Sequence, residues 1–344
     1  MPNVQEVFRM ATQKVRQGPG ALERQVGRQR RAARNRRFGA FATVLVFVAV
    51  TVAVYSLTRS DTRGGAAPGG TTSTVPSFTG PAMVDLSTGD VTPLPPSIAT
   101  AGGAYYAVSP DHTKVAYSRC CNLSEPLLVA NVDGTQVRQI SAKGWDTFGA
   151  QWSPDGSLLV YQQRDGSTEH LGNLVVQDVA TGRRTRLTNF DQTQIWGWWF
   201  MFPSFAPDGR SILFHLPRGS NAAPIWDLWS VPVAGGKPTL VRRNAGWGGY
   251  SPDGKSLAYL SPVTADFSGG RLLVTSVQGG TPRAMVSTGH LNWLRWSPDG
   301  TRISYVDGRS VYVLNVAIGS TTKVAEGNTA EWLDDNTLII GPGG

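Results

Sequence analysis

Residues 296–305 read WSPDGTRISY, and four similar stretches precede this one in the chain. The core is Ser-Pro-Asp at residues 109–111, 153–155, 251–253 and 297–299, and Ala-Pro-Asp at 206–208. Gly follows in four copies, and His112 takes its place in the first. Proline presets φ at the second position of a type I turn, while Ser and Gly suit its first and fourth positions. Each copy therefore predicts a tight turn.

The residues around each turn repeat as well. An apolar residue follows each Pro by five positions and an aromatic one by seven; the pairs are Val115 and Tyr117, Leu159 and Tyr161, Ile212 and Phe214, Leu257 and Tyr259, and Ile303 and Tyr305. A spacing of two is the side-chain period of a strand. A second hairpin with a Gly-containing turn follows each first one. Four strands in a repeat of about 40–50 residues are typical of a β-propeller blade.

The two ends of the repeat region complement each other. Residues 330–341, AEWLDDNTLIIG, supply a first hairpin with a degenerate turn, and 82–94, AMVDLSTGDVTPL, supply a second. Pairing them would close the ring and remove exposed sheet edges. The sequence predicts an all-β fold, a six-bladed β-propeller closed by N- and C-terminal strands.

These motifs resemble the TolB-type, WD40-like propeller family, over about residues 82–341. The resemblance implies the propeller fold. It leaves the function open, because that family includes periplasmic scaffolds, sensor domains and peptidase-gating domains. The chain differs from secreted TolB in its predicted anchor, and from the propeller-bearing peptidases because a hydrolase domain is missing.

The segment before the repeats predicts a membrane anchor. Residues 1–37 form a basic arm with ten Arg and Lys side chains, and 38–57, FGAFATVLVFVAVTVAVYSL, contain no charge. Twenty apolar residues span a bilayer as a helix, and the flanking arginines place the arm in the cytoplasm. A cleaved signal peptide is the alternative, but the preceding segment is long for one. Residues 58–80 read as a flexible linker, and 81–344 as an extracytoplasmic propeller.

Motifs of catalysis and of cofactor binding are missing from the sequence. It contains no G-x-S-x-G nucleophile elbow, H-E-x-x-H, Walker A or dinucleotide fingerprint. Outside the arm the charges balance, so the propeller carries no basic patch for nucleic acid. We expect a non-catalytic protein without a cofactor or metal.

Alternating strands place the Ser-Pro-Asp turns on one face of the propeller and the longer loops on the other. Loops on a rigid scaffold usually carry binding. The longest includes four aromatic residues, Trp196, Trp198, Trp199 and Phe200, which either anchor a partner or pack between blades. His170, His215 and His290 could converge on the same face as a ligand or acid–base site, or lie scattered on the surface.

Two further features leave alternatives open. Cys120 and Cys121 are adjacent and could form a strained bridge, an intermolecular disulfide or two free thiols. In the arm, one helical face carries five apolar residues, Val4, Val7, Phe8, Ala11 and Val15. This face suits either a cytoplasmic docking partner or the anionic inner leaflet.

Three functions fit these observations. The first is a single-pass, membrane-anchored module that binds a protein or a cell-envelope ligand. The second is a transmembrane signalling component, similar to an anti-sigma protein, whose arm engages a cytoplasmic regulator. The third is an enzyme with its site on the loop-rich face.

Overall fold

The computed structural model describes residues 78–99, 104–119, 126–142, 144–165, 172–190, 201–220, 223–263 and 269–341. These residues form strands and turns, as the repeats predict. No helix among the described segments is long and apolar enough to cross a membrane. The predicted arm, the membrane helix and nearly all of the linker lie outside the described residues.

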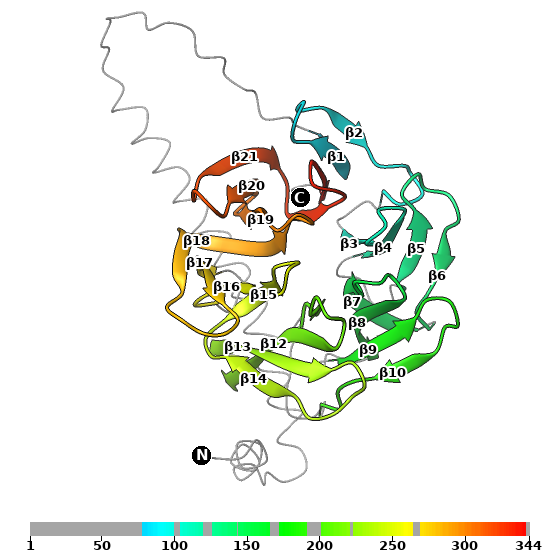
Figure 1. The fold of residues 1–344 in the computed structure, drawn as a ribbon. Coiled ribbons are helices and arrows are strands. Elements are labelled where there is room, and N and C mark those ends of the chain that lie inside the picture. Colours follow the sequence, from blue (N-terminus) through cyan, green and yellow to red (C-terminus); the bar gives the residue numbers. More distant parts are fainter. Residues whose placement is uncertain are drawn as a thin grey trace, which may run out of the picture. The chain divides into compact units, whose positions relative to one another are not determined.

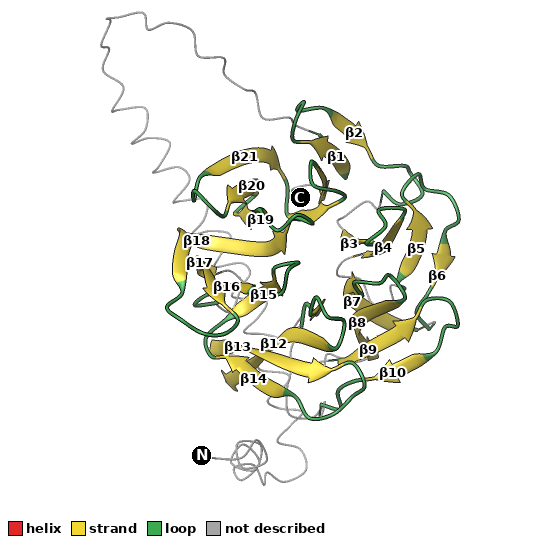
Figure 2. Ribbon diagram, in the orientation of Figure 1, coloured by secondary structure: helices red, strands yellow, loops and turns green. Residues whose placement is uncertain are grey.

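The described strands form antiparallel sheets arranged around a centre (Figures 1 and 2). Three of these sheets have their four strands in chain order. They are β3 (Ala104–Val108), β4 (Lys114–Arg119), β5 (Leu128–Asn131) and β6 (Arg138–Gln139); β7 (Trp145–Trp152), β8 (Leu158–Asp165), β9 (Asn173–Asp178) and β10 (Arg184–Arg186); and β11 (Ser204–Phe205), β12 (Ser211–Ser220), β13 (Ala223–Pro232) and β14 (Thr239–Arg242).

A fourth sheet has seven described strands. They are β15 (Gly246–Tyr250), β16 (Ser256–Leu260), β17 (Gly269–Ser276), β18 (Arg283–Trp296), β19 (Arg302–Asp307), β20 (Ser310–Asn315) and β21 (Thr321–Glu326). β18 is 14 residues long and pairs with β17 through its first part and with β19 through its last part. One strand thus joins two four-stranded units, where the sequence predicts two separate strands.

The last sheet joins the two ends of the repeat region. Its order is β2 (Val91–Pro93), β1 (Ala82–Asp85), β23 (Thr337–Gly341) and β22 (Thr329–Trp332). β1 pairs antiparallel with β23, so that Ala82 faces Ile340 and Val84 faces Leu338. The predicted closure by terminal strands is confirmed.

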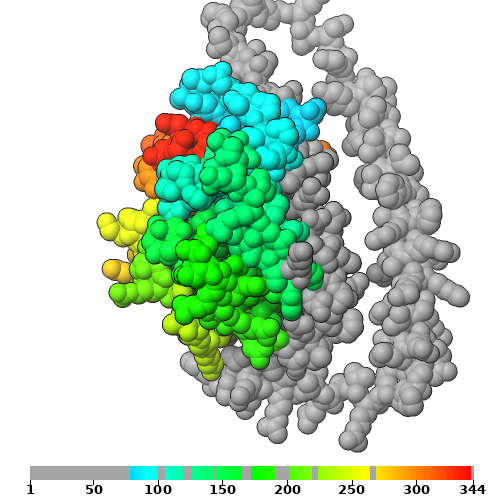
Figure 3. Space-filling model, turned by 90° about the vertical axis from the view of Figure 1, so that its right-hand side faces the viewer, coloured from blue at the N-terminus to red at the C-terminus, as the bar shows by residue number. Residues whose placement is uncertain are grey.

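Contacts between neighbouring sheets continue around the whole circle. β3 contacts β7, β7 contacts β11, β12 contacts β15, β15 contacts β18, β18 contacts β22, and β22 contacts β3. In Figure 3 the cyan residues of β1 and β2 adjoin the green residues of the sheets that follow them. The prediction of an all-β propeller is confirmed.

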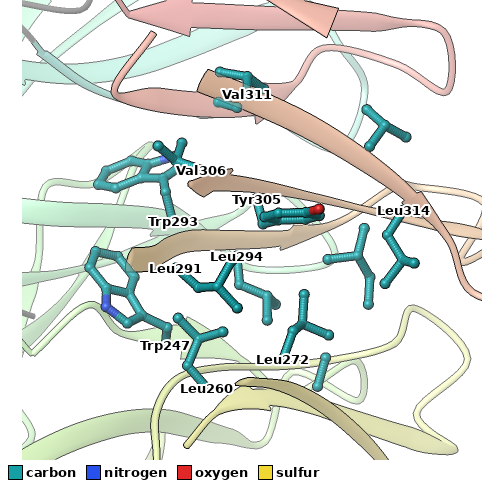
Figure 4. Close-up of a cluster of buried hydrophobic side chains, with 14 of the residues drawn as sticks. Trp247, Leu260, Leu272, Leu291, Trp293, Leu294, Tyr305, Val306, Val311 and Leu314 are labelled. Carbon is teal, nitrogen blue, oxygen red and sulfur yellow. The ribbon is translucent and has the colours of Figure 1, made fainter. Parts of the chain in front are cut away.

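The predicted apolar columns form the core between the sheets. Each residue five positions after a turn proline is at most 4% exposed, and each aromatic residue seven positions after it at most 3%. Figure 4 shows part of this core, in which Tyr305 lies between Leu294 and Leu314. Burying such a side chain contributes about 1.5–3 kcal/mol, so the repeated columns hold neighbouring sheets together.

Candidate functional site

The Ser-Pro-Asp turns are built by one repeated set of hydrogen bonds. In the first copy, Ser109 Oγ donates to Asp111 Oδ1 at 2.5 Å and accepts the Lys114 amide at 2.9 Å. The same two bonds recur from Ser153, Ser251 and Ser297, at 2.5–2.6 Å and 2.8–2.9 Å. The serine and aspartate are therefore occupied in holding the turn.

Each turn also lies close to the turn before it. Gly156 has a φ of +71°, and a Cβ added there would lie 3.7 Å from Pro110 of the preceding turn. Gly300 has a φ of +70°, and a Cβ there would lie 3.3 Å from Pro252. In the first turn His112 adopts φ +60°, and its Nδ1 bonds the Leu333 carbonyl in the closing sheet. His112 is exposed, and its ring also joins the first turn to the closing sheet.

The innermost strands surround a cavity of about 370 Å³ on the Ser-Pro-Asp face, which we call the funnel. Its lining comes from the ends of strands in every described sheet. Turn prolines and aromatic residues form the wall. The aromatic residues lie two positions before a turn proline or, for Trp332, at the equivalent place in the closing sheet; the set is Pro110, Pro154, Pro207, Pro252, Pro298, Trp152, Phe205, Tyr250, Trp296 and Trp332. The volume lies within the range of ligand pockets, ~300–1,000 Å³.

The funnel also has a polar side, formed by residues three positions before the turn prolines and by Glu331 at the equivalent place in the closing sheet. Arg295 Nε donates to Glu331 Oε2 at 2.9 Å, with the two side chains 18% and 12% exposed. Burial raises the pKa of Glu331, and the charge and hydrogen bond of Arg295 oppose this shift. The Gln151 amide nitrogen makes no well-aligned hydrogen bond with the described residues, although Gln151 lies close enough to Glu331 to favour its ionised form.

An aromatic cluster, which we call the plug, fills the centre of the ring. Its residues lie two positions further from the turns than Gln151 and Arg295. The plug consists of Tyr105, Phe202, Trp247 and Trp293, contributed by four different parts of the circle. Phe202 stacks on Trp247 with centroids 4.0 Å apart, and Tyr105 stacks on Trp293 at 5.2 Å. Figure 4 shows Trp247 and Trp293 at the same end of the core. Their ring centroids are 5.6 Å apart. The rings meet at the axis, so the funnel is closed at this level.

The backbone is strained where it forms the plug. Phe202, Trp247 and Trp293 have φ of +38°, +49° and +53°, a region that bulky residues rarely adopt. The register of β15 and β18 shifts at the latter two positions, as it does in β7 around Gly149, φ +61°. Bulges re-aim side chains, and strain of this kind persists only where surrounding packing maintains it.

The structure does not bring the predicted histidines together as a described site. His215 is 2% exposed, packs edge-on against Trp226 at 5.0 Å, and accepts the Trp247 amide at Nδ1. His290 lies exposed in β18. No group of three His, Cys, Asp or Glu side chains among the described residues could hold a metal.

The other predicted site residues lie outside the described residues. This applies to His170, to Trp196, Trp198, Trp199 and Phe200, to Cys120 and Cys121, and to Val4, Val7, Phe8, Ala11 and Val15. The funnel lies at the Ser-Pro-Asp turns, whereas the sequence predicted a binding site on the other face. The sequence did not indicate Gln151, Arg295 and Glu331 as site residues, because the residue type at their position in the repeat differs from one copy to the next.

A ring of antiparallel sheets with a central funnel defines the chain as a β-propeller. A family model described as the TolB beta propeller domain matches residues 112–339. The chain belongs to this family, which confirms the resemblance seen in the repeats.

Relatives of known sequence match over part of their length. An uncharacterized protein of Agrobacterium fabrum is 27% identical over 217 residues, 59% of this chain and 66% of that protein. The Tol-Pal system protein TolB of Francisella tularensis subsp. holarctica is 25% identical over 249 residues, 67% of this chain and 53% of TolB. The chain thus matches about half to two-thirds of these proteins.

Solved structures support the same fold. The putative TolB from Agrobacterium tumefaciens has a TM-score of 0.59 at 15% identity, covering 77% of this chain and 98% of that one. TolB from Acinetobacter baumannii has a TM-score of 0.54 at 15% identity, covering 76% and 64%. At this identity the likeness concerns the fold alone.

Proposed function

We propose that the chain is a membrane-anchored, extracytoplasmic binding protein whose propeller holds a partner protein in the funnel without catalysing a reaction. The observation that carries the proposal is the funnel itself. It is open at the Ser-Pro-Asp face, closed by the plug and lined by rigid prolines and aromatic rings. Such a surface is pre-organised, and aromatic residues are frequent in the centre of protein interfaces.

A binding role is favoured over a catalytic one by the state of the funnel's charged residues. Among the described residues that line it, Arg295 and Glu331 carry the charges, and they are paired with each other. A general acid or base would have to reach a substrate proton directly. This pair is better suited to shaping a surface for a ligand.

The domain organisation that we propose has a six-bladed propeller over residues 81–344, with β18 shared by two blades. The continuous circle of contacts supports this count. The uncharged stretch 38–57 and its flanking arginines support an anchor with the arm 1–37 in the cytoplasm. Residues 58–80 would then hold the propeller outside the membrane.

Site-specific crosslinking in cells tests the proposal. A photoreactive residue at Ser157, an exposed position in a Ser-Pro-Asp turn, should capture one discrete partner protein. The matched control is Ile318, which is 77% exposed in an outer turn of the same face and should capture none. A large residue introduced at Ser204, in the funnel wall, should abolish capture from Ser157. Capture that is equal from both positions, or unaffected by the Ser204 variant, would exclude the funnel as the binding site.

A further inference from the structure

The turns around the funnel have a more negative net charge than the rest of the propeller. The six turns that surround its mouth, at 109–114, 153–158, 206–211, 251–256, 297–302 and 333–337, contain seven carboxylates and four basic side chains, a net charge of −3. The other residues between 78 and 341 hold 14 acidic and 16 basic groups. The negative charge is thus concentrated at the mouth.

Three of these carboxylates, Asp111, Asp155 and Asp253, have a pKa below the ordinary value. The hydroxyl of Ser109 and the amide and hydroxyl of Thr113 lower the pKa of Asp111 to about 2. Hydrogen bonds from the corresponding serines also lower the pKa of Asp155 and Asp253. The excess negative charge comes from the two turns that contain no basic side chain, which hold Asp155 in one and Asp334 and Asp335 in the other.

Cations are already accommodated against the aromatic residues of this region. The guanidinium of Arg295 lies over the Trp293 ring at 5.2 Å, and that of Arg302 over the Trp332 ring at 5.3 Å. Tyr250 and Trp296 stand half-buried on the wall of the funnel. Beside them the lining is small at Ser204, which has a short side chain, and at Gly249, which has none. This sector leaves room next to aromatic faces, which attract cations.

From this pattern we infer that the occupant of the funnel is a basic, extended segment of the partner protein, which inserts a Lys or Arg side chain toward the Tyr250–Trp296 wall and Glu331. The inference rests on the proposed function, because it assumes that the funnel binds a protein. The closed lower end admits a side chain or a chain end, and not a threaded chain. The acidic mouth would attract such a segment from solution and repel an acidic one.

Labelled peptides test the charge of the occupant directly. Three nonapeptides of Gly and Ser would carry three Lys, three Gln or three Glu residues, and their binding to the full-length protein in lipid nanodiscs would be measured by fluorescence anisotropy. The Lys peptide should bind at least tenfold more tightly than the Gln peptide, and the Glu peptide most weakly. Raising the salt from 50 to 300 mM should weaken the Lys peptide several-fold, since exposed charges are screened.

Matched variants locate the site. Glu331→Gln should weaken the Lys peptide at least fivefold, whereas Glu326→Gln, the same change at an exposed residue outside the funnel lining, should leave it unchanged. Asp155→Asn at the mouth is a second variant, to be used if Glu331→Gln does not fold. Equal binding of the three peptides, or preference for Glu, would overturn the inference. If the peptides show no preference for Lys but the Ser204 variant still abolishes capture from Ser157, the inference about the charge of the occupant fails and the proposed function stands. If the Ser204 variant also has no effect on capture, the proposed function fails as well.

Discussion

The indole N–H of Trp152 donates to the backbone carbonyl of Ala107 at 2.9 Å, which connects β7 to the innermost strand of the preceding sheet. Two further residues repeat the bond between neighbouring innermost strands: Trp296 of β18 donates to Gly249 of β15 at 3.0 Å, and Trp332 of β22 donates to Arg295 of β18 at 3.2 Å. Each donor lies two positions before its turn proline, or at the equivalent place in the closing sheet. Each acceptor lies three positions before the preceding proline. The propeller is therefore linked near its axis by polar bonds as well as by apolar packing.

Replacing Trp152 by Phe should lower the free energy of unfolding by about 1–3 kcal/mol, because the buried hydrogen bond from the indole N–H to the Ala107 carbonyl is lost and the smaller ring leaves a gap. Denaturant unfolding followed by circular dichroism measures this. Trp296→Phe should act in the same direction. The two sites lie in different sheets and share no partner, so the effects should add in the double variant. Unchanged midpoints would show that these bonds do not stabilise the ring.

Gly156→Ala should destabilise the propeller by about 1 kcal/mol, because an alanine must adopt φ +71° there. Gly249→Ala provides an unusually close control. A Cβ at either position would have its nearest neighbour at 3.7 Å, an ordinary contact, but only Gly156 has a left-handed backbone. We therefore expect the Gly249 variant to match or slightly exceed the wild type in denaturant unfolding. Equal losses in both would attribute the effect to crowding and not to φ.

The sequence predicted the features that repeat and missed those that vary between sheets. The turn motif and its apolar columns predicted the strands, the buried faces and the closure of β1 on β23, because each of them depends on local period and turn chemistry. The continuous strand β18 was missed, since no turn residue distinguishes an outer strand that runs directly into the next inner one. The plug was missed as well. Phe202 and Trp247 adopt a backbone that their residue type disfavours, and only tertiary packing could impose it.

The candidate site depended on information that periodicity does not contain. Arg295 and Glu331 lie in neighbouring innermost strands, 36 residues apart in sequence, and their ion pair follows from the curvature of the ring. In the sequence each occupies an ordinary strand position beside a tryptophan. The sequence predicted a site on the opposite face because it places the longer loops there. Loop length indicates variability and does not indicate where a cavity lies.

Stability should fall as the pH is lowered from about 4 to about 2. The pKa of Asp111 in the folded protein is about 2, below its ordinary value of 3.8, mainly because the Ser109 hydroxyl and the Thr113 amide bond the ionised form. A carboxyl with a depressed pKa stabilises the fold above its unfolded pKa, and this contribution disappears as the folded pKa is approached. Denaturant midpoints between pH 2 and 6 should therefore decrease across this window. Asp111→Asn should flatten the decrease, whereas a profile as steep as that of the wild type would assign the acid sensitivity to other groups.

Two N-terminal truncations should separate the propeller from the residues before it. Removing residues 1–77 should leave the thermal midpoint of the propeller unchanged, because every described strand is retained. Removing residues 1–94 also deletes β1 and β2, and with them the partners of Leu338, Ile339 and Ile340 in β23. An unpaired β23 would expose a sheet edge and part of the core, and such edges associate with other chains. We expect the longer truncation to aggregate or to melt well below the shorter one, as measured by size-exclusion chromatography and circular dichroism. Identical behaviour of the two would mean that closure by β1 contributes little to the stability of the ring.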